Sequence, residues 1–285
     1  MSRFLILGGD PRQLYLHRLL KQSGHETDLY YDMPKTPFSL KNAMEESHII
    51  LCPIPFTKDG RTICSEHGLP GLDIDTFLTC LGEKHILFGG CIPSAVKVYC
   101  DSRRIPCFDF MKMEEVAWKN AVATAEGAVA EAISLSPVNL HQSRCLVTGW
   151  GRCACTLASK LKGMDAHVTI AARDRTKLAQ ARSMGYSTVL LGELGSELKH
   201  YDFIFNTIPA MVLDSSLTGY IKLEAAVIDI ASAPGGVDFK SLEHFGIRAR
   251  LCPGLPGICA PLSSAQILYE AVMEHLELER NCLWN

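Results

Sequence analysis

A glycine-rich turn at residues 149–154 constrains the fold of this chain more than any other feature. The segment Arg144–Thr148 contains an apolar run, Gly149-Trp-Gly151-Arg-Cys-Ala154 follows it, and a helical pattern then continues through Leu161. In a strand, turn and helix of this kind, the glycines let backbone N–H groups approach a pyrophosphate at the positive end of the helix. The segment predicts a dinucleotide-binding fold with a nicotinamide or flavin nucleotide as ligand.

Strand and helix signals alternate on both sides of this turn. In the first third, candidate strands at 4–7, 27–31, 48–52, 85–88 and 106–108 are separated by helical patterns at 12–22, 40–46 and 74–81. After a helical run at 111–135, a second series has strands at 145–148, 167–171, 188–190, 203–206, 226–230 and 248–251. Such alternation is typical of parallel sheets with helices on both faces. We therefore predict an α/β protein with two doubly wound parallel-sheet, Rossmann-like domains joined by a long helix.

The domain boundaries follow from this series. We place a flavodoxin-like substrate domain at residues 1–118 and a Rossmann NADP-binding domain at residues 119–261. A helical pattern at 262–278 follows the proline-rich loop 253–261. By analogy with two-domain dehydrogenases, we expect the segment 262–285 to pack back on the first domain.

Composition narrows the class of ligand. Of 285 residues, 47% are hydrophobic and 21% charged, and the net charge is only −3, which argues against nucleic acid or a membrane surface as partner. No apolar run is long enough to span a membrane. The twelve cysteines are scattered and include no Cys-x-x-Cys pair. This pattern favours reduced thiols in a cytoplasmic protein and no metal site.

The residues after the second strand of the second series favour NADP(H) over NAD(H). An NAD-binding fold places Asp or Glu about 20 residues after the glycines, whereas this chain has Ala172 there, followed by Arg173 and, nearby, Lys177. Such cations suit a 2′-phosphate. Asp174 leaves NAD(H) open, because a shift of two residues would bring it to the ribose, and a solvated charged turn is the alternative without a ligand.

The remaining cofactor residues are predicted from their position at strand ends, where open α/β sheets bind ligands. Small polar loops follow the fourth and fifth strands of the second series and could line the nicotinamide ribose and ring. The same residue types are also ordinary turn formers and helix caps. The predicted cofactor-binding set comprises Gly149, Trp150, Gly151, Arg152, Cys153, Ala172, Arg173, Asp174, Lys177, Asn206, Thr207, Ile208, Pro209, Asp229, Ile230 and Ala231.

Several motifs together resemble one family, the A-subunits of dipicolinate synthase. They are Gly8-Gly-Asp-Pro-Arg-Gln13, Asn120-Ala-Val-Ala-Thr-Ala-Glu-Gly127, Asn206-Thr-Ile-Pro209, Asp229-Ile-Ala-Ser-Ala-Pro-Gly-Gly-Val-Asp-Phe239 and Pro253-Gly-Leu-Pro-Gly-Ile-Cys-Ala-Pro261. The resemblance covers nearly the whole chain. The chain departs from the family pattern at Ala123, Ala154 and Ala233, and the last puts a substrate contact in doubt because we expect a basic residue there.

The resemblance implies the last step of dipicolinate synthesis in sporulating bacteria. The substrate would be 4-hydroxy-tetrahydrodipicolinate or the dihydrodipicolinate formed by its dehydration, and the product pyridine-2,6-dicarboxylate. It implies NADP-dependent oxidation with a flavoprotein-like partner, the B-subunit of the synthase, in the cytoplasm of the mother cell. A homo-oligomer stays open.

Catalytic and substrate residues are predicted from loops and strand ends. Glu126, on the long helix at the expected cleft, is the candidate acid or base, with a solvated glutamate as the alternative. Backbone donors and cations near strand ends could hold a dicarboxylate. The predicted substrate-binding set comprises Arg12, Thr57, Lys58, Gly90, Ser94, Ser232, Gly235 and Gly257.

Two other functions stay open. A D-2-hydroxyacid dehydrogenase would share this architecture but needs a cationic anchor after the strand ending near Asp229 and a histidine near the loop 253–261, and neither stretch supplies one. A non-catalytic nucleotide-binding scaffold for a flavoprotein partner is the alternative from another class. It fits the lack of a strong catalytic acid or base in the sequence.

Overall fold

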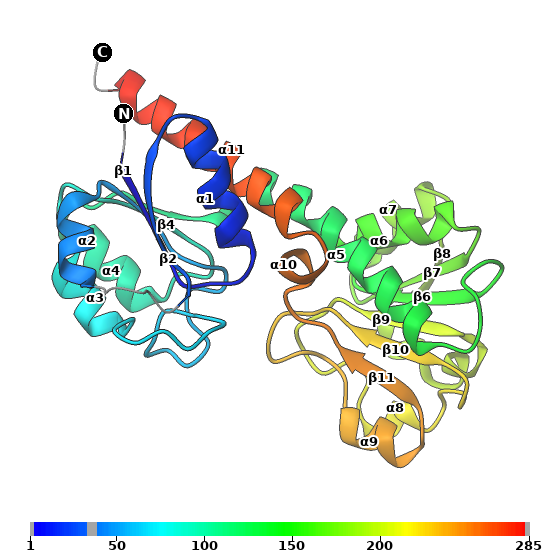
Figure 1. The fold of residues 1–285 in the computed structure, drawn as a ribbon. Helices are drawn as coiled ribbons and strands as arrows, with labels where there is room; N and C mark the ends of the chain where they lie inside the picture. The colour runs from blue at the N-terminus through cyan, green and yellow to red at the C-terminus, as the bar shows by residue number, and fades with distance from the viewer. Residues whose placement is uncertain (1–2, 33–38, 283–285) are drawn as a thin grey trace. The chain divides into compact units, whose positions relative to one another are not determined.

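The computed structural model describes residues 3–32 and 39–282, with side chains through residue 278. The chain forms two compact units: unit 1 comprises residues 1–117 and 260–285, and unit 2 comprises residues 118–259. Helix α5 (Glu114–Leu135) begins in unit 1 and continues into unit 2 (Figure 1). The predicted terminal segment 262–285 extends three residues beyond the described part.

Unit 1 is built on a five-stranded parallel sheet in the order β2-β1-β3-β4-β5. This is the flavodoxin-like doubly wound order, in which the chain reverses direction between β1 and β3. The strands are β1 (Arg3–Leu7), β2 (Glu26–Tyr30), β3 (Ile49–Leu51), β4 (Ile86–Gly89) and β5 (Cys107–Asp109). The helices are α1 (Arg12–Gln22), α2 (Leu40–Glu46), α3 (Ile74–Cys80), α4 (Ser94–Ser102) and α11 (Pro261–Cys282).

The core of unit 1 lies on both faces of this sheet. Leu5 and Leu7 of β1 point into a cluster with α2, α3 and α4, and Phe4 and Ile6 point into a second cluster. That second cluster contains residues of α1 and α11, which lie side by side (Figure 1). A strand covered on both faces reads as a continuous apolar run, as β1 does.

Unit 2 carries a six-stranded parallel sheet in the order β11-β10-β9-β6-β7-β8. This is the Rossmann order, with the reversal between β6 and β9. The strands are β6 (Arg144–Thr148), β7 (His167–Ala172), β8 (Ser187–Leu190), β9 (Phe203–Asn206), β10 (Ala226–Asp229) and β11 (Arg248–Leu251). The helices are α6 (Arg152–Gly163), α7 (Arg175–Ser183), α8 (Ser215–Thr218), α9 (Phe239–His244) and α10 (Leu255–Cys259). The fold class predicted from the sequence is confirmed.

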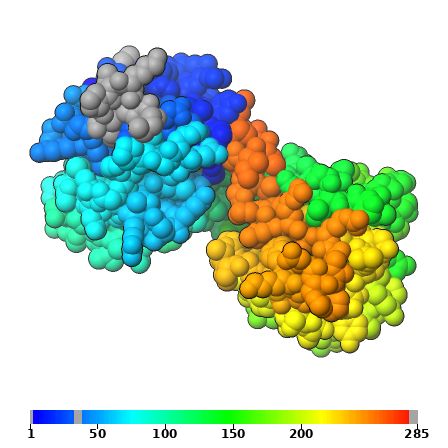
Figure 2. Space-filling model, turned by 60° about the horizontal axis from the view of Figure 1, so that its bottom comes forward, coloured from blue at the N-terminus to red at the C-terminus, as the bar shows by residue number. Residues whose placement is uncertain are grey.

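The two faces of the second sheet are also both covered. Cys145 and Val147 of β6 pack with α5, α6 and α7, and Leu146 packs on the opposite side with the segments that follow β8 and β10. The part of the chain after β9 forms much of the face of unit 2 seen in Figure 2, in yellow and orange.

Three elements differ from the sequence prediction. The long helix begins at Glu114 rather than Met111, because Asp109 accepts a hydrogen bond from the Met111 N–H at 2.9 Å and caps a short 3₁₀ turn, Phe110–Lys112. Helix α4 was not predicted, since its β-branched and aromatic residues weaken the helical signal. The proline-rich loop contains the short helix α10, and α11 begins at Pro261, a favoured first helical residue.

No helix among the described residues is long and apolar enough to cross a membrane.

Candidate nucleotide site in unit 2 and substrate residues in unit 1

The turn between β6 and α6 begins with a glycine that no other residue replaces without strain. Gly149 has φ +92°, and a Cβ atom there would lie 2.6 Å from the hydroxyl oxygen of Thr207. Its N–H donates to the carbonyl of Ala171 at 2.7 Å, which ties the turn to β7. A side chain would therefore meet both an unfavourable backbone conformation and a collision.

The helix that follows has no side-chain cap at its N-terminus. Gly151 is the N-cap residue of the twelve-residue helix α6, and as a glycine it offers no side-chain cap to the first-turn N–H groups. A Cβ at Gly151 would meet no heavy atom within 4 Å. The space beside these donors is therefore open, and uncapped N–H groups at the positive end of a helix favour an anion such as a pyrophosphate.

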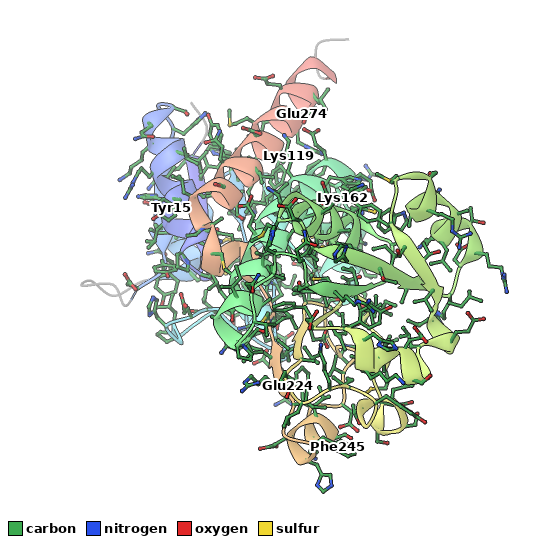
Figure 3. The ribbon with its side chains drawn as sticks, turned by 90° about the vertical axis from the view of Figure 1, so that its right-hand side faces the viewer. Tyr15, Lys119, Lys162, Glu224, Phe245 and Glu274 are labelled. Atoms are coloured by element: carbon green, nitrogen blue, oxygen red, sulfur yellow. The ribbon has the colours of Figure 1, made fainter. Side chains whose placement is uncertain are left out.

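Two other residues of the motif, Trp150 and Ala154, are buried and pack against the interior of unit 2. Trp150 is 7% exposed, and its ring packs edge to face on Tyr186 with centroids 5.5 Å apart. The Lys162 ammonium lies 5.1 Å from the centroid of the same Tyr186 ring. The side chain of Lys162 is labelled in Figure 3. Arg152 and Cys153 are half-buried, and burial raises the pKa of the Cys153 thiol. Ala154 is fully buried, as the close helix packing at that position requires.

The end of β7 presents exposed cations. Ala172, its last residue, is buried, whereas Arg173 and Lys177 are exposed. Within the described part of the chain, the Arg173 side chain has neither an ion pair nor a hydrogen bond. Asp174 caps α7, because its Oδ1 accepts from the Thr176 N–H at 2.8 Å. One carboxylate oxygen of Asp174 is therefore already engaged, while Arg173 is available to an anion.

A buried polar network joins the ends of β6, β9 and β10. The Thr148 hydroxyl donates to Asn206 Oδ1 at 2.6 Å, and Asn206 Nδ2 donates to Asp229 Oδ1 at 2.8 Å. All three side chains are fully buried. Each polar atom thus finds a partner inside the protein, which such burial demands. Asn206 and Asp229, predicted as cofactor ligands, here hold the loops in place with their side chains.

The loop after β9 is fixed through the same network. The Thr207 hydroxyl donates to the carbonyl of Thr148 at 2.7 Å, and the Ile208 N–H donates to Asn206 Oδ1 at 3.2 Å. Thr207 and Ile208 are half-buried and Pro209 is exposed. This loop therefore lies directly beside Gly149, with a defined backbone.

The loop after β10 is held by Asp229. Its carboxylate accepts from the N–H groups of Ala231 at 3.0 Å and Gly236 at 2.8 Å. Gly235 has φ +82°, and a Cβ at Gly236 would lie 2.5 Å from the Ala210 carbonyl oxygen. The Pro-Gly-Gly sequence thus bends the chain back onto the loop after β9.

The remaining predicted residues of unit 2 are more scattered. Ile230 donates its N–H to the Asn206 carbonyl at 2.9 Å, and Ser232 is exposed. Gly257 is buried in α10. Glu126 lies on the exposed side of α5, where its carboxylate pairs with Lys160 at 2.6 Å. The structure therefore places Glu126 in a surface ion pair of unit 2.

In unit 1, the turn after β1 is filled by the protein itself. A Cβ at Gly8 would lie 2.3 Å from the carbonyl oxygen of Cys64. Asp10 accepts from the Arg12 backbone N–H at 3.1 Å, and its carboxylate pairs with the Arg12 guanidinium at 2.5 Å. Arg12 is 7% exposed and also donates to the Ile54 carbonyl at 2.6 Å. Arg12, which was predicted to bind substrate, is thus paired with Asp10 in this structure.

The other substrate candidates of unit 1 follow β3 and β4. The Thr57 hydroxyl donates to Asp59 at 3.0 Å, and hydrogen bonds from the N–H groups of Thr62 and Arg61 hold the pKa of Asp59 below its usual range. Lys58 is exposed. Thr57 and Lys58 therefore belong to a loop whose conformation is fixed by internal hydrogen bonds.

Gly90 and Ser94 flank the start of α4. A Cβ at Gly90 would lie 2.3 Å from the side chain of Ile54, so the backbone of these two loops is in close contact. Ser94 is exposed and is the first residue of α4, whose N-terminus has no side-chain cap. Residues 3–32 and 39–282 contain no cluster of three or more His, Cys, Asp or Glu side chains that could hold a metal ion.

Thr148 shapes the site but was not predicted from the sequence to do so, whereas the Pro234-Gly235-Gly236 sequence was expected to form a tight turn at the ligand. Thr148 is the one polar residue at the end of the apolar run of β6, and this position at a strand end was the signal for it. Gly236 is the second glycine of a Pro-Gly-Gly sequence, where close backbone approach is a common reason for glycine.

Comparison with known proteins gives the same relationship in sequence and in fold. The family profile of the N-terminal domain of the dipicolinate synthase A-subunit matches residues 3–111. The dipicolinate synthase A-subunit of Bacillus subtilis (strain 168) is 28% identical over 284 residues, which cover 93% of each chain. The crystal structure of the dipicolinate synthase A-subunit from Bacillus halodurans superposes with a TM-score of 0.85 at 27% identity, covering 96% of this chain and 97% of that one.

A more distant likeness concerns the fold alone. The D-lactate dehydrogenase of Escherichia coli superposes with a TM-score of 0.70 at 13% identity, covering 99% of this chain and 98% of that one. The dehydrogenase-like architecture is thus shared, while the whole-length sequence similarity is to the synthase proteins. The chain is thus similar over nearly its whole length to dipicolinate synthase A-subunits, and residues 3–111 match the profile of their N-terminal domain.

Proposed function

We propose that this chain is an NADP-dependent oxidoreductase that converts dihydrodipicolinate into pyridine-2,6-dicarboxylate. The observation that carries the proposal is the N-terminus of α6, which has no side-chain cap. A Cβ atom at Gly151 would meet no heavy atom within 4 Å there. Backbone N–H groups at the positive end of a helix favour an anion such as a pyrophosphate. The similarity to dipicolinate synthase A-subunits supplies the proposed substrate class.

The choice of NADP(H) rests on the cations at the end of β7. Arg173 is exposed and without an ion pair in the described part of the chain, and Lys177 lies one turn further on. Arg binds a phosphate through two parallel hydrogen bonds, which suits a 2′-phosphate. Asp174, the residue that would favour NAD(H), caps α7 instead.

The residues of unit 2 have a positioning role in this proposal. The bound nucleotide would accept a hydride from the dihydropyridine ring, while a proton leaves to a base, so that the ring loses two hydrogens and becomes aromatic. The buried Thr148–Asn206–Asp229 network fixes the two loops that would face the nicotinamide. Thr207, Ile208, Pro209, Ile230 and Ala231 would then contact it mainly through their backbone.

The proton step is assigned to Glu126. To act as the base, its carboxylate would have to exchange its 2.6 Å contact with Lys160 for the substrate. The dicarboxylate would be held by Arg12, Thr57, Lys58, Gly90, Ser94, Ser232, Gly235 and Gly257. Arg12 would have to share its guanidinium between Asp10 and a substrate carboxylate.

The relatives are A-subunits by name, and on this basis we propose a flavoprotein-like partner, the B-subunit of the synthase. The complex would act in the cytoplasm of the mother cell of a sporulating bacterium. One observation favours a second function, that of a nucleotide-binding scaffold: Glu126 is exposed and ion-paired, and the buried Asp229 is engaged by backbone N–H groups.

One assay separates the two functions. Freshly made 4-hydroxy-tetrahydrodipicolinate and NADP⁺ are supplied to this chain alone and then together with the flavoprotein-like partner, and dipicolinate is followed by its near-ultraviolet absorbance. Product that requires this chain and tracks NADP⁺ reduction supports the oxidoreductase. If this chain and its partner together form product without needing NADP⁺, the partner carries out the redox step. That result would support the scaffold function for this chain.

A further inference from the structure

Two cysteines of unit 1 are brought into contact by the turn that links α4 to β5. Cys100 lies in the last turn of α4, and Cys107 is the first residue of β5. The carbonyl of Cys100 accepts hydrogen bonds from the N–H groups of Arg103 at 3.2 Å and Ile105 at 2.9 Å, and Arg104 has φ +56°. The turn is therefore tightly held, and it returns the chain directly to the helix end.

The two thiols interact within one core cluster. Cys107 packs against the cluster that contains Cys100, and a side-chain interaction joins the two thiols. Cys100 is fully buried in the core beneath the sheet, whereas Cys107 is half-buried. One member of the pair is thus accessible, and the other lies directly behind it. Both are free thiols in this structure.

The accessible thiol opens into a cavity. Cys107 lines a cavity of about 280 Å³ together with Phe108, Met113 and His275, and with Lys97 and Lys112. This volume admits a small reagent, because a water molecule occupies about 30 Å³ of liquid. The most apolar wall is formed by aromatic packing, since Phe108 and His275 meet with ring centroids 4.9 Å apart. The half-buried Cys107 therefore lies at the wall of a cavity that can admit a small oxidant.

A cation stands beside the accessible thiol. Lys97 precedes Cys100 by one helical turn, so both residues face β5 from the same side of α4. The Lys97 ammonium donates to the Cys107 carbonyl at 3.4 Å and pairs with Asp101 at 2.9 Å. Asp101 and Asp109 are the acidic groups near Cys107, and the Asp109 carboxylate accepts from the N–H groups of Cys91 and Ile92 at 3.0 Å each.

These contacts shift the pKa values of the two thiols in opposite directions. The side-chain interaction with Cys100, with the Lys97 charge, lowers the pKa of Cys107, while the same interaction raises the pKa of Cys100. We assign the thiolate to Cys107 because it is the more exposed of the two. Burial raises the pKa of Cys52, and likewise brings that of Cys145 to about 12. A thiolate is the reactive form of cysteine.

We propose that Cys107 and Cys100 form a reversible oxidation site, in which a peroxide oxidises Cys107 and Cys100 then closes a disulfide. In the first step the Cys107 thiolate attacks one peroxide oxygen of H₂O₂, the O–O bond breaks, and a sulfenic acid forms with release of hydroxide, which takes up a proton as water. In the second step the Cys100 sulfur, having lost its proton, displaces the sulfenic oxygen as water. Two thiols and one peroxide thus give one disulfide and two waters. A dithiol reductant reverses the reaction.

This site is independent of the proposed nucleotide site, which lies in unit 2. Its disulfide would join the last turn of α4 to β5 and remove the thiolate from the cavity. A sulfur–sulfur bond of about 2.05 Å would replace the side-chain interaction that already joins the two residues.

Peptide mapping tests the proposal directly on the full chain. Trypsin cuts after Lys97, Arg103, Arg104 and Lys112, so Cys100 and Cys107 fall in separate peptides, residues 98–103 and 105–112, each with one cysteine. After treatment with one equivalent of H₂O₂ and blocking of free thiols, we expect these two peptides to be linked by a disulfide, two hydrogens lighter than their sum. Dithiothreitol should separate them.

Matched variants assign the steps. Cys100→Ser should keep Cys107 as a sulfenic acid that dimedone traps, and Cys107→Ser should abolish both the trapped acid and the linked peptide. Cys91, an exposed cysteine whose pKa is raised by burial of its sulfur and by Asp109, is the internal control. In the untreated protein, iodoacetamide should label Cys107 at least tenfold faster than Cys91. Equal labelling rates, or peroxide consumption without the 98–103 to 105–112 link, would overturn the proposal.

Discussion

The two units repeat one structural device and use it differently. In each, the first strand ends in a glycine-rich turn at the point where the sheet order reverses, and a helix begins there. In unit 2, Gly151 leaves the N-terminus of α6 uncapped and the space beside it open. In unit 1, the corresponding turn packs on Cys64, and Asp10 accepts from the first turn of α1.

The difference shows that topology offers a position for a ligand but does not decide whether one binds. At the N-terminus of α1, where a ligand anion could bind, the Asp10 carboxylate is already present. The buried Arg12 guanidinium neutralises its charge. The anion position of α6 is left for a ligand. This contrast supports the proposed nucleotide site in unit 2, because in unit 1 the Asp10 carboxylate fills the corresponding position.

The largest expected effect is on the stability of unit 1. Gly8→Ala places a Cβ 2.3 Å from the Cys64 carbonyl oxygen at φ +55°. We expect a loss of about 3 kcal/mol in the free energy of unfolding, from overpacking and strain. Gly151→Ala is the matched control in unit 2, and its stability should stay within about 0.5 kcal/mol of the parent because the site is open. Urea unfolding followed by circular dichroism measures both, and equal losses would remove the contrast.

The next effect separates helix capping from ligand binding in unit 2. Gly151→Asp would place a carboxylate at the N-cap of α6, as Asp10 does near α1. We expect NADP(H) affinity to fall about 100-fold, or about 2.7 kcal/mol, because this charge would occupy the pyrophosphate position. The melting temperature should not fall, since Asp is a good N-cap residue. Calorimetric titration with unchanged affinity would contradict the assignment of this turn.

The reverse change in unit 1 has a smaller effect. Asp10→Ala leaves the 7%-exposed Arg12 without its carboxylate. We expect a loss of about 2 kcal/mol in stability, between the values for exposed and fully buried pairs. Asp10→Asn, which keeps an acceptor for the Arg12 N–H, should lose less. NADP(H) affinity should be unchanged in both, and a tenfold drop would show that the turn of unit 1 also takes part in nucleotide binding.

The smallest effect concerns the choice of cofactor. Arg173→Ala should weaken NADP(H) binding about tenfold, or about 1.4 kcal/mol, and leave NAD(H) binding nearly unchanged. Lys199→Ala, an exposed cation elsewhere in unit 2, is a control for general charge effects. Parallel titrations with both nucleotides give the ratio of affinities. A ratio that does not move would contradict the 2′-phosphate site at Arg173.

Much of the fold was predictable because its signals are local. The apolar run of β1 indicates a strand, and the glycines and prolines between such runs indicate turns. Helix α1 was predicted with its observed bounds. Helix α4 was missed because its helical state depends on packing beneath the sheet rather than on its β-branched residues.

The site was predictable only in part, because side-chain direction is set by tertiary contacts. The positions of Asn206 and Asp229 at strand ends were predicted, but the sequence does not reveal that their side chains bind each other. Trp150 likewise lies in the motif yet points into the core. The side chains of such residues hold the backbone that would contact a ligand. A sequence motif alone does not show this indirect role.

Hydrogen–deuterium exchange of the whole chain with and without saturating NADPH tests the contrast between the two turns most directly. The account predicts slower exchange at the backbone amides of residues 149–156, with no change at residues 8–14. Protection at residues 8–14 in place of 149–156, or no protection at either turn while NADPH is bound, would contradict it.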